Sequence, residues 1–506
     1  MPKTSRSVRS PRAQSVDRAS TGIAGLDSIL GGGLPTNHLY LIDGEPGTGK
    51  TTLALQFLLE GAKLGERGLY VTLSESAVEL EGVAQSHGWI LDDIDVFELD
   101  TARVGGEDEY TLFHPAEVEL QETVSEVLKA VTEAKPARVV FDSLSEMRLL
   151  ARDPLRFRRQ ILALKQYFAG RQCTVLLLDD KSAPEGDMQL HSLAHGVVAL
   201  EHIAMDYGAE RRRLQVNKLR GARFWGGYHD FRICTGGIAV YPRIRRGGSQ
   251  QPLVESTLKS NSGALDDLLG GGLTRGTSTL ITGAAGTGKT VLTVQYMCAA
   301  VERGDRARLF MFDERLTTFR MRAEGLGLDL SAPLADGRLT LVQIEPTQMS
   351  PGEFANELVR AVEEDGVTLI GIDSINGYLN AMPTERLLGV QLHELLSYLA
   401  DRGVTSILTL VQQGVFGGPV EDAVEVSYLA DTVVLLRYFE FQGAVRGAIS
   451  VVKKRSGDHE HTIRECRVEH GGLHVGHPLT DFHGVLTGVP QYTGAGDPLM
   501  DGDRTA

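Results

Sequence analysis

The sequence has few cysteines, and none of them is paired at a metal-binding spacing. Its four cysteines are widely separated along 506 residues, and no C-x-x-C or mixed Cys/His motif occurs. This pattern argues against a zinc site and favours a protein of the reducing cytoplasm. The cysteines are Cys173, Cys234, Cys298 and Cys466.

Long apolar runs and excess positive charge are also missing. No run approaches the roughly 18–20 apolar residues of a membrane span, so we expect no membrane segment. Residues 1–20 are rich in Ser and Arg but lack the apolar core of a secretory signal. We interpret residues 1–19 as a disordered basic tail, and a docking role for it stays open. The formal net charge of −15 argues against a general binder of nucleic acid or anionic membrane.

Two glycine-rich segments match the phosphate-binding motif G-x-x-x-x-G-K-[ST]. Each lies between a short apolar strand candidate and a run with helical spacing. In this motif backbone N–H groups surround a di- or triphosphate, the Lys reaches the β and γ oxygens, and the Thr hydroxyl meets Mg²⁺. The predicted nucleotide-binding residues are Gly44, Gly47, Thr48, Gly49, Lys50, Thr51 and Thr52, and Gly283, Gly286, Thr287, Gly288, Lys289, Thr290 and Val291.

The two motifs belong to a tandem duplication. Asp27 and Asp266 are 239 residues apart, and so are Lys50 and Lys289. A segment ending in Gly-Gly-Gly-Leu precedes each motif, at 31–34 and at 270–273. A constant offset over separate motifs indicates two copies of one domain.

Each copy alternates strands with helices, which predicts an α/β fold with a mostly parallel sheet flanked by helices on both faces. Shorter alternating strands close each copy, at 213–219 and 236–241 and at 448–453 and 462–468, and we expect them to be antiparallel edge strands. A change to Arg, Gly, Ser and Gln marks the junction. The predicted parts are a first domain at 20–247, a linker at 248–255, a second domain at 256–480 and a tail at 481–506.

A strand that ends in Asp follows each phosphate loop. The apolar runs before Asp142 and Asp373 place a carboxylate where it can hold the Mg²⁺ shell from the side opposite the loop. We therefore predict Thr51 with Asp142, and Thr290 with Asp373, as the residues that hold Mg²⁺.

Hydrolysis also needs a base that orients and activates water. A carboxylate at the tip of the strand adjacent to the phosphate loop can reach this water. The candidates are Glu75 in the first copy and Asp313 and Glu314 in the second. The alternative is that these residues only cap the following helix. We favour the catalytic interpretation because both copies keep Glu at the second of two adjacent positions.

Two Lys-x-Arg segments lie at equivalent places in the two copies, at 218–220 and 453–455. Because strand periodicity is two, Lys218 and Arg220 project to one face, as do Lys453 and Arg455. Such cations either form a solvated edge or reach the triphosphate of a neighbouring subunit, as arginine fingers do. Spacing alone leaves both possibilities open.

Together these motifs resemble the KaiC family, double-domain relatives of RecA-type ATPases, over roughly residues 20–490. The resemblance implies two tandem RecA-like domains and a two-tiered homohexamer that binds ATP and Mg²⁺ between subunits. It implies a first lobe that is an ATPase and a second that is a serine/threonine autokinase and phosphatase of circadian timing. The family's paired Glu appears as Ser74-Glu75 and as Asp313-Glu314. The family's ATP contacts in trans match Lys218-Leu219-Arg220 and Lys453-Lys454-Arg455.

The family's phosphorylated Ser-Thr pair corresponds to Ser427 and Tyr428. The resemblance therefore implies Ser427 as the phosphoacceptor. Tyr428 would be a poor one, because its hydroxyl lies further from the backbone than that of Thr and in-line transfer tolerates little misplacement. The tail by which clock members capture KaiA is not evident, so KaiA is not expected as a partner. A KaiB-like or other signalling partner stays open.

Two rival functions stay open, and the first belongs to the same superfamily. A RecA/RadA-type DNA-dependent ATPase needs cations near the ring centre. Residues 412–436 contain no Lys or Arg, and 182–210 is also acidic, so we expect no nucleic acid as a partner. The other rival is an ATP-gated assembly switch without kinase activity, and the two Glu candidates argue against a wholly inactive ring.

Overall fold

The computed structural model describes residues 17–98, 115–151, 153–180, 188–205, 208–245, 256–380, 388–412, 427–486 and 490–494. Most of the predicted basic tail, at 1–16, lies outside these residues. The chain divides into two compact units, one formed by residues up to Arg243 except 207–209, and the other by 207–209 and the residues from Ile244 on. We call them the first and second lobes. The predicted domain limits stay predictions, although ordered structure already begins at Arg18–Ala19, which pairs with Leu34–Pro35.

The first lobe is built on one nine-stranded sheet with the strand order β11-β10-β9-β8-β3-β7-β6-β4-β5. Strands β8, β3, β7, β6, β4 and β5 are parallel, and β9 to β11 extend the sheet in antiparallel fashion. The elements are β1 (Arg18–Ala19), α1 (Ala24–Leu30), β2 (Leu34–Pro35), β3 (Leu39–Gly44), α2 (Lys50–Lys63), β4 (Gly68–Thr72), α3 (Ala77–Ser86), β5 (Ile94–Glu98), α4 (Pro115–Ala134), β6 (Arg138–Asp142), α5 (Leu144–Ala151), α6 (Pro154–Phe168), β7 (Thr174–Asp180), α7 (Met188–Leu193), β8 (Gly196–Ile203), β9 (Arg211–Leu219), β10 (Tyr228–Cys234) and β11 (Gly237–Tyr241).

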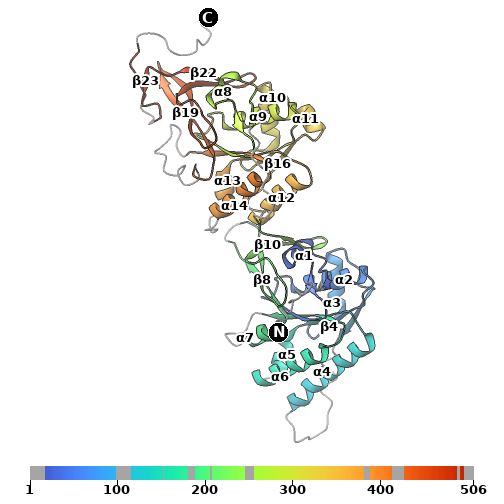
Figure 1. Ribbon diagram of the computed structural model, residues 1–506. Helices are drawn as coiled ribbons and strands as arrows, with labels where there is room; N and C mark the ends of the chain where they lie inside the picture. Colours follow the sequence, from blue (N-terminus) through green and yellow to red (C-terminus); the bar gives the residue numbers. More distant parts are fainter. Residues whose placement is uncertain are drawn as a thin grey trace, which may run out of the picture. The chain divides into compact units, whose positions relative to one another are not determined.

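The second lobe repeats this plan, with the strand order β16-β15-β17-β18-β14-β19-β20-β21-β22. Figure 1 shows the ribbon of each lobe with its main helices labelled. Its elements are β12 (Thr257–Leu258), α8 (Gly263–Leu268), β13 (Leu273–Thr274), β14 (Ser278–Gly283), α9 (Lys289–Glu302), β15 (Ala307–Met311), α10 (Leu316–Gly325), α11 (Ser331–Ala335), β16 (Leu339–Gln343), α12 (Pro351–Glu363), β17 (Leu369–Asp373), α13 (Ile375–Asn380), α14 (Leu388–Asp401), β18 (Thr405–Val411), β19 (Thr432–Phe441), β20 (Ala444–Lys454), β21 (Arg464–Glu469), β22 (Gly472–Pro478), β23 (Phe482–His483) and β24 (Gln491–Tyr492). The predicted fold class, two tandem RecA-like P-loop domains with helices flanking a mostly parallel sheet, is confirmed.

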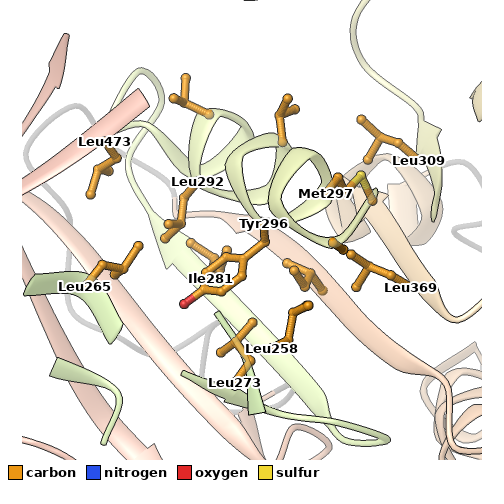
Figure 2. Close-up of a cluster of buried hydrophobic side chains, with 14 of the residues drawn as sticks. Leu258, Leu265, Leu273, Ile281, Leu292, Tyr296, Met297, Leu309, Leu369 and Leu473 are labelled. Carbon is orange, nitrogen blue, oxygen red and sulfur yellow. The ribbon is translucent and has the colours of Figure 1, made fainter. Parts of the chain in front are cut away.

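Helices cover both faces of each sheet. In the second lobe α8, α9 and α10 contribute to one hydrophobic cluster, while α12, α13 and α14 contribute to another. Figure 2 shows Leu292, Tyr296 and Met297 of α9 packed among strand residues that include Ile281 and Leu309. The central strands are buried on both sides, which explains why their sequences are continuous apolar runs instead of alternating ones.

One expectation about the antiparallel part is wrong. The strand predicted at 236–241 does lie at an edge, as β11. The strands at the other three predicted positions, β9, β20 and β21, have a neighbour on each side, and β22 forms the antiparallel edge of the second lobe. The alternating patterns that suggested edges instead reflect strands covered less completely than the parallel ones, with intermediate and exposed positions among buried ones.

Among the described residues, no helix is long and apolar enough to cross a lipid bilayer.

Candidate nucleotide sites

The first phosphate loop connects β3 to α2 and needs glycine at two positions. Gly47 and Gly49 have φ angles of +80° and +97°, in the left-handed region that disfavours other residues. Gly49 is the N-cap of α2 and provides no side chain to cap it. The first N–H groups of α2 therefore present a ready site for an anion. Gly286 and Gly288 have the same role before α9, with φ angles of +82° and +99°.

Threonine hydroxyls brace both loops from within. The Thr48 hydroxyl donates to the Glu45 carbonyl at 2.8 Å, and the Thr287 hydroxyl donates to the Ala284 carbonyl at 2.9 Å. A Cβ atom on Gly44 would lie 2.7 Å from the Thr48 hydroxyl, so this position admits only glycine. The Thr48 and Thr287 N–H groups also donate to the same two carbonyls, at 3.3 and 3.4 Å, so the two threonines shape the loops from within.

The two loop lysines fold over their own loops. Lys50 Nζ donates to the carbonyls of Gly44 and Glu45 at 2.8 and 3.0 Å. Lys289 Nζ donates to those of Gly283 and Ala284 at 2.9 and 2.7 Å. Burial lowers the pKa of Lys289 to about 8, and the Asp373 carboxylate opposes this effect. Both ammonium groups thus lie where the β and γ oxygens of a nucleotide would come. The neighbouring Thr52 and Val291 are buried in the first turns of α2 and α9.

The predicted Mg²⁺ residues meet in both lobes. The Thr51 hydroxyl lies 3.2 Å from Asp142 Oδ2, and the Thr290 hydroxyl lies 2.6 Å from Asp373 Oδ2. A hydroxyl and a carboxylate are oxygen ligands of the kind Mg²⁺ prefers, and Mg²⁺ in nucleotide sites takes its other ligands from phosphate and water. No group of three or more His, Cys, Asp or Glu side chains in the described parts could hold a metal alone. The residues present therefore fit Mg²⁺ that arrives with a nucleotide.

Each of the two aspartates has a second donor, and sequence reasoning missed both donors. The Tyr70 hydroxyl donates to Asp142 in the first lobe, and the Thr409 hydroxyl donates to Asp373 in the second. Burial raises the pKa of Asp142, while the hydrogen bonds from Tyr70 and Thr51 oppose the rise. These donors come from strands on opposite sides of the aspartate, so only the strand order could have identified them.

Glu75 follows β4 and is not used as a helix cap. Its backbone is fixed by Thr72, whose hydroxyl donates to the Glu75 carbonyl at 2.6 Å and accepts from the Glu75 N–H at 3.0 Å. The cap of α3 is instead Ser76, which forms a capping box with Glu79. Glu75 Oε2 is buried, and no residue in the described ranges forms a hydrogen bond with it. Burial raises the pKa of Glu75, and the Asp142 and Glu79 carboxylates raise it further.

The second-lobe carboxylates are engaged with neighbouring side chains. Asp313 accepts a hydrogen bond from the Ser374 hydroxyl at 2.6 Å, and Glu314 forms an ion pair with Arg322 at 2.7 Å. Burial raises the pKa of Glu314 and Arg322 opposes the rise. Val83 occupies the position in α3 that corresponds to Arg322 in α10. The base candidates therefore differ between lobes: Glu75 has an unpartnered oxygen, whereas Glu314 is paired with a cation.

The Lys-x-Arg cations contact the segment that leads into the preceding, neighbouring strand, which is β19 in the second lobe and β8 in the first. Lys453 Nζ donates to the carbonyls of Ser427 and Ala430 at 3.0 and 2.7 Å, and the Arg455 guanidinium donates to that of Tyr428 at 3.0 Å. The first lobe repeats this arrangement, since Lys218 contacts His191 and Ser192 carbonyls and Arg220 contacts that of Ser192. The cations and the predicted acceptor segment therefore form one local structure.

Strand register separates these cations from the phosphate loop of their own lobe. Gly283 at the loop pairs with Leu436 of β19, whereas Lys453 pairs with Val433, three residues earlier. At about 3.3 Å per residue this places them about 10 Å apart along the sheet. Arg455 lies still further in the same direction. The first lobe has the same spacing between Leu200, opposite Gly44, and Val197, opposite Lys218.

The middle residues of the two Lys-x-Arg segments, Leu219 and Lys454, contact other parts of their own lobes. Leu219 is buried in the hydrophobic core of the first lobe. Lys454 Nζ donates to the Leu269 carbonyl, next to the Gly-Gly-Gly-Leu segment. These two residues were predicted to bind ATP, but their side chains are not brought together with the Lys and Arg beside them.

A cavity of about 480 Å³ lies beside the second phosphate loop, and the sequence offered no signal for it. It has the size of ligand pockets and combines polar with apolar lining. Gly286 and Thr287 of the loop form one wall, and residues of β19 to β21 form the others, among them Tyr438, Arg446 and Arg467. A nucleoside joined to phosphates in the loop would find room here.

Comparison with known proteins gives one consistent result. The family model described as "ATPase: KaiC" matches residues 19–245 and 259–480. The "Circadian clock protein KaiC3" of Synechocystis sp. (strain PCC 6803) is 27% identical over 490 residues, which covers 94% of this chain and 95% of the relative. The "Circadian clock oscillator protein KaiC" of Acaryochloris marina is 26% identical over 94% and 91%, and that of Prochlorococcus marinus is 27% identical over 96% and 97%. With both lobes matched almost in full, this chain belongs to the KaiC family of ATPases.

Proposed function

We propose that this KaiC-family ATPase hydrolyses ATP in its first lobe and phosphorylates its own Ser427 in the second, and so acts as a signalling or timing switch. The observation that carries the proposal is the difference between Glu75, which has a buried unpartnered oxygen, and Glu314, which is ion-paired with Arg322. We infer that the first lobe is equipped to activate water and the second to hold an acceptor hydroxyl. The four cysteines are free, which suits a reducing cytoplasm.

In the first lobe, Glu75 would orient the attacking water and accept its proton. Thr51 and Asp142 would hold Mg²⁺, which neutralises charge on the phosphates when bound. Lys50 and the N–H groups of α2 would hold the β and γ oxygens. The partial burial of Glu75 strengthens its interaction with a proton, so the carboxylate is a better base than an exposed one.

In the second lobe, the hydroxyl of Ser427 would attack the γ-phosphorus of ATP. The Ser427 Oγ–P bond forms, the bond from phosphorus to the β–γ bridging oxygen breaks, ADP leaves, and Glu314 accepts the hydroxyl proton. Ser427 is half-buried, with its carbonyl held by Lys453, whereas the Tyr428 side chain is 59% exposed. Anchoring the backbone of a short side chain limits where its hydroxyl can lie, as in-line transfer requires.

The acceptor and the cations would act on the nucleotide of a neighbouring subunit in a homohexamer. The separation of Lys453 and Arg455 from their own loop supports this arrangement. Because both cations bind carbonyls of the acceptor segment, a subunit that presents the cations to a neighbour presents Ser427 with them. A KaiB-like or other signalling protein could then respond to the phosphorylation state, whereas we expect neither KaiA nor nucleic acid as a partner.

Replacing either loop lysine should weaken nucleotide binding in one lobe only. We expect Lys50→Ala and Lys289→Ala each to lower the affinity of its own lobe for Mg-ADP by roughly 10- to 100-fold, because charge-assisted hydrogen bonds are lost. Isothermal titration calorimetry would show half of the sites weakened in each variant. Lys63→Ala, at an exposed position of α2, is the control. Loss of all sites from one substitution would contradict two independent loops.

Removing the carboxylate of Glu75 should slow hydrolysis without loss of binding. In a Glu314→Gln background, we expect Glu75→Gln to lower phosphate release by about 10²–10⁴-fold, the usual contribution of a positioned base. Glu81→Gln, at an exposed position of the following helix α3, should change little. The base must be ionised and its pKa is raised, so the rate should fall with decreasing pH at a midpoint above the ordinary Glu value of about 4.3. Unchanged turnover in Glu75→Gln would rule out this assignment.

Incubation with Mg-ATP should place phosphate on Ser427. We expect mass spectrometry to find it on the peptide that spans 425–437, with Ser427→Ala removing it and Tyr428→Phe retaining it. Lys289→Ala should also abolish the modification, because the second-lobe nucleotide is the donor. If ATP is consumed and this peptide stays unmodified at every time point, the second lobe is an ATPase or assembly switch and not a kinase.

The chain should form hexamers that depend on nucleotide. We expect light scattering to give six times the 54.9 kDa chain mass in Mg-ATP. The combined Arg220→Ala and Arg455→Ala substitutions should shift the mass toward the monomer by removing contacts to neighbouring phosphates. Arg223→Ala, an exposed cation three residues after Arg220, is the matched control. The same monomeric mass with and without Mg-ATP would contradict the hexamer.

A further inference from the structure

The two loop lysines have the same loop contacts but differ in a third partner. An ammonium has three N–H donors. In the first lobe Lys50 uses two on loop carbonyls, and Asp180 Oδ1 lies 2.7 Å from the same nitrogen. In the second lobe Lys289 contacts two loop carbonyls, and within the described ranges no carboxylate forms an ion pair with it. All three donors are therefore occupied in one lobe, but only two in the other.

Asp180 is held in place independently of Lys50. It is the last residue of β7, the strand between β3 and β6, and it pairs with Gly44 at the start of the phosphate loop. The Ser145 hydroxyl donates to Asp180 Oδ2 at 3.0 Å and accepts from the Asp180 N–H at 3.3 Å. The carboxylate would thus keep its position when Lys50 turns to another partner.

The second lobe has an apolar residue at the same register. Val411 pairs with Gly283 as Asp180 pairs with Gly44. Asn376, the counterpart of Ser145, exchanges two hydrogen bonds with the backbone of Val411. The backbone frame is therefore the same in both lobes, and the difference is one carboxylate at the rim of the nucleotide site.

We propose that Asp180 is an internal competitor for phosphate that lowers the nucleotide affinity of the first lobe relative to the second. This inference rests on the proposed binding of the same nucleotide at both loops. A phosphate oxygen that engages Lys50 must replace one of its three partners, and the Asp180 carboxylate carries the same sign of charge as the phosphate. At Lys289 a donor is available without displacement of an anion.

If Asp180 instead helped Lys50 to bind phosphate, replacing it would change the nucleotide affinity in the opposite direction. If Asp180 only aligned Lys50 for phosphate, its removal would weaken binding. If Asp180 competes, its removal strengthens binding. Because Asp180 is 27% exposed and Lys50 is 8% exposed, solvent screens the pair only in part. We expect a change of about tenfold in affinity, within the range of a partly buried ion pair.

The test replaces Asp180 in the first lobe and Val411 in the second lobe of the full-length chain, and it measures Mg-ADP binding by calorimetry. In a Lys289→Ala background, which reports the first lobe, Asp180→Asn and Asp180→Val should each tighten binding about tenfold. Asp180→Asn is nearly isosteric and removes only the charge, so it remains informative if Asp180→Val does not fold. In a Lys50→Ala background, which reports the second lobe, Val411→Asp should weaken binding by a similar factor.

The outcomes distinguish a failure of the competitor role of Asp180 from a failure of the proposed first-lobe function. Unchanged or weaker first-lobe binding in Asp180→Asn would overturn the competitor role, while the proposed ATPase function would stand. No binding to the Lys289→Ala protein at any concentration of Mg-ADP would contradict the proposed function in the first lobe, and with it this inference. Tighter binding in Asp180→Asn together with weaker binding in Val411→Asp would establish it.

Discussion

The hydrogen bond between the first-turn threonine of the loop helix and the strand-end aspartate depends on the order of strands in the sheet. Asp142 is not on the strand next to the loop strand: β7 lies between β6 and β3. All three strands are parallel and in register, so their carboxyl ends meet at one edge, and α2 begins at that edge. Thr51 and Asp142 can therefore meet although 91 residues separate them. Ligands of open α/β sheets bind at this edge for the same reason.

The two lobes share this arrangement of parallel strands and differ in the charged side chains near its carboxyl edge. Among the described residues, no cation pairs with Glu75 as Arg322 does with Glu314. Lys50 has a carboxylate beside it, and Val411 takes the equivalent register in the second lobe. None of these side chains supports the sheet, because the frame is held by strand pairing and by buried apolar clusters. A duplicated domain can therefore change the chemistry of one copy while keeping its fold.

Most of the order of strands and helices could be predicted from the sequence, because the same motifs recur in both halves. The phosphate loops are 239 residues apart, the strand-end aspartates 231 and the Lys-x-Arg segments 235. The helix at Pro115–Ala134 and the strands ending at Asp142 and Asp373 agree with the pattern. The contact between Lys50 and Asp180 could not be predicted, since it depends on which strand lies beside β3 and not on order along the chain. The positions of β9 and β20 inside the sheet were mistaken for edges for the same reason. The acidic stretches at 182–210 and 412–436 lie partly outside the described residues, at 182–187, 206–207 and 413–426.

The buried Glu75 oxygen, which no donor in the described parts of the chain reaches, supports the catalytic role proposed for this residue. Leaving a polar group unsatisfied costs about 1–3 kcal/mol, so a side chain with only a structural role would be expected to acquire a donor. The local structure does not need this carboxylate, because Thr72 fixes the backbone and Ser76 caps α3. Burial and the Asp142 charge make the carboxylate costly to ionise in the folded chain. A water molecule positioned by this oxygen, with its proton moving toward it, is the partner that would relieve that cost.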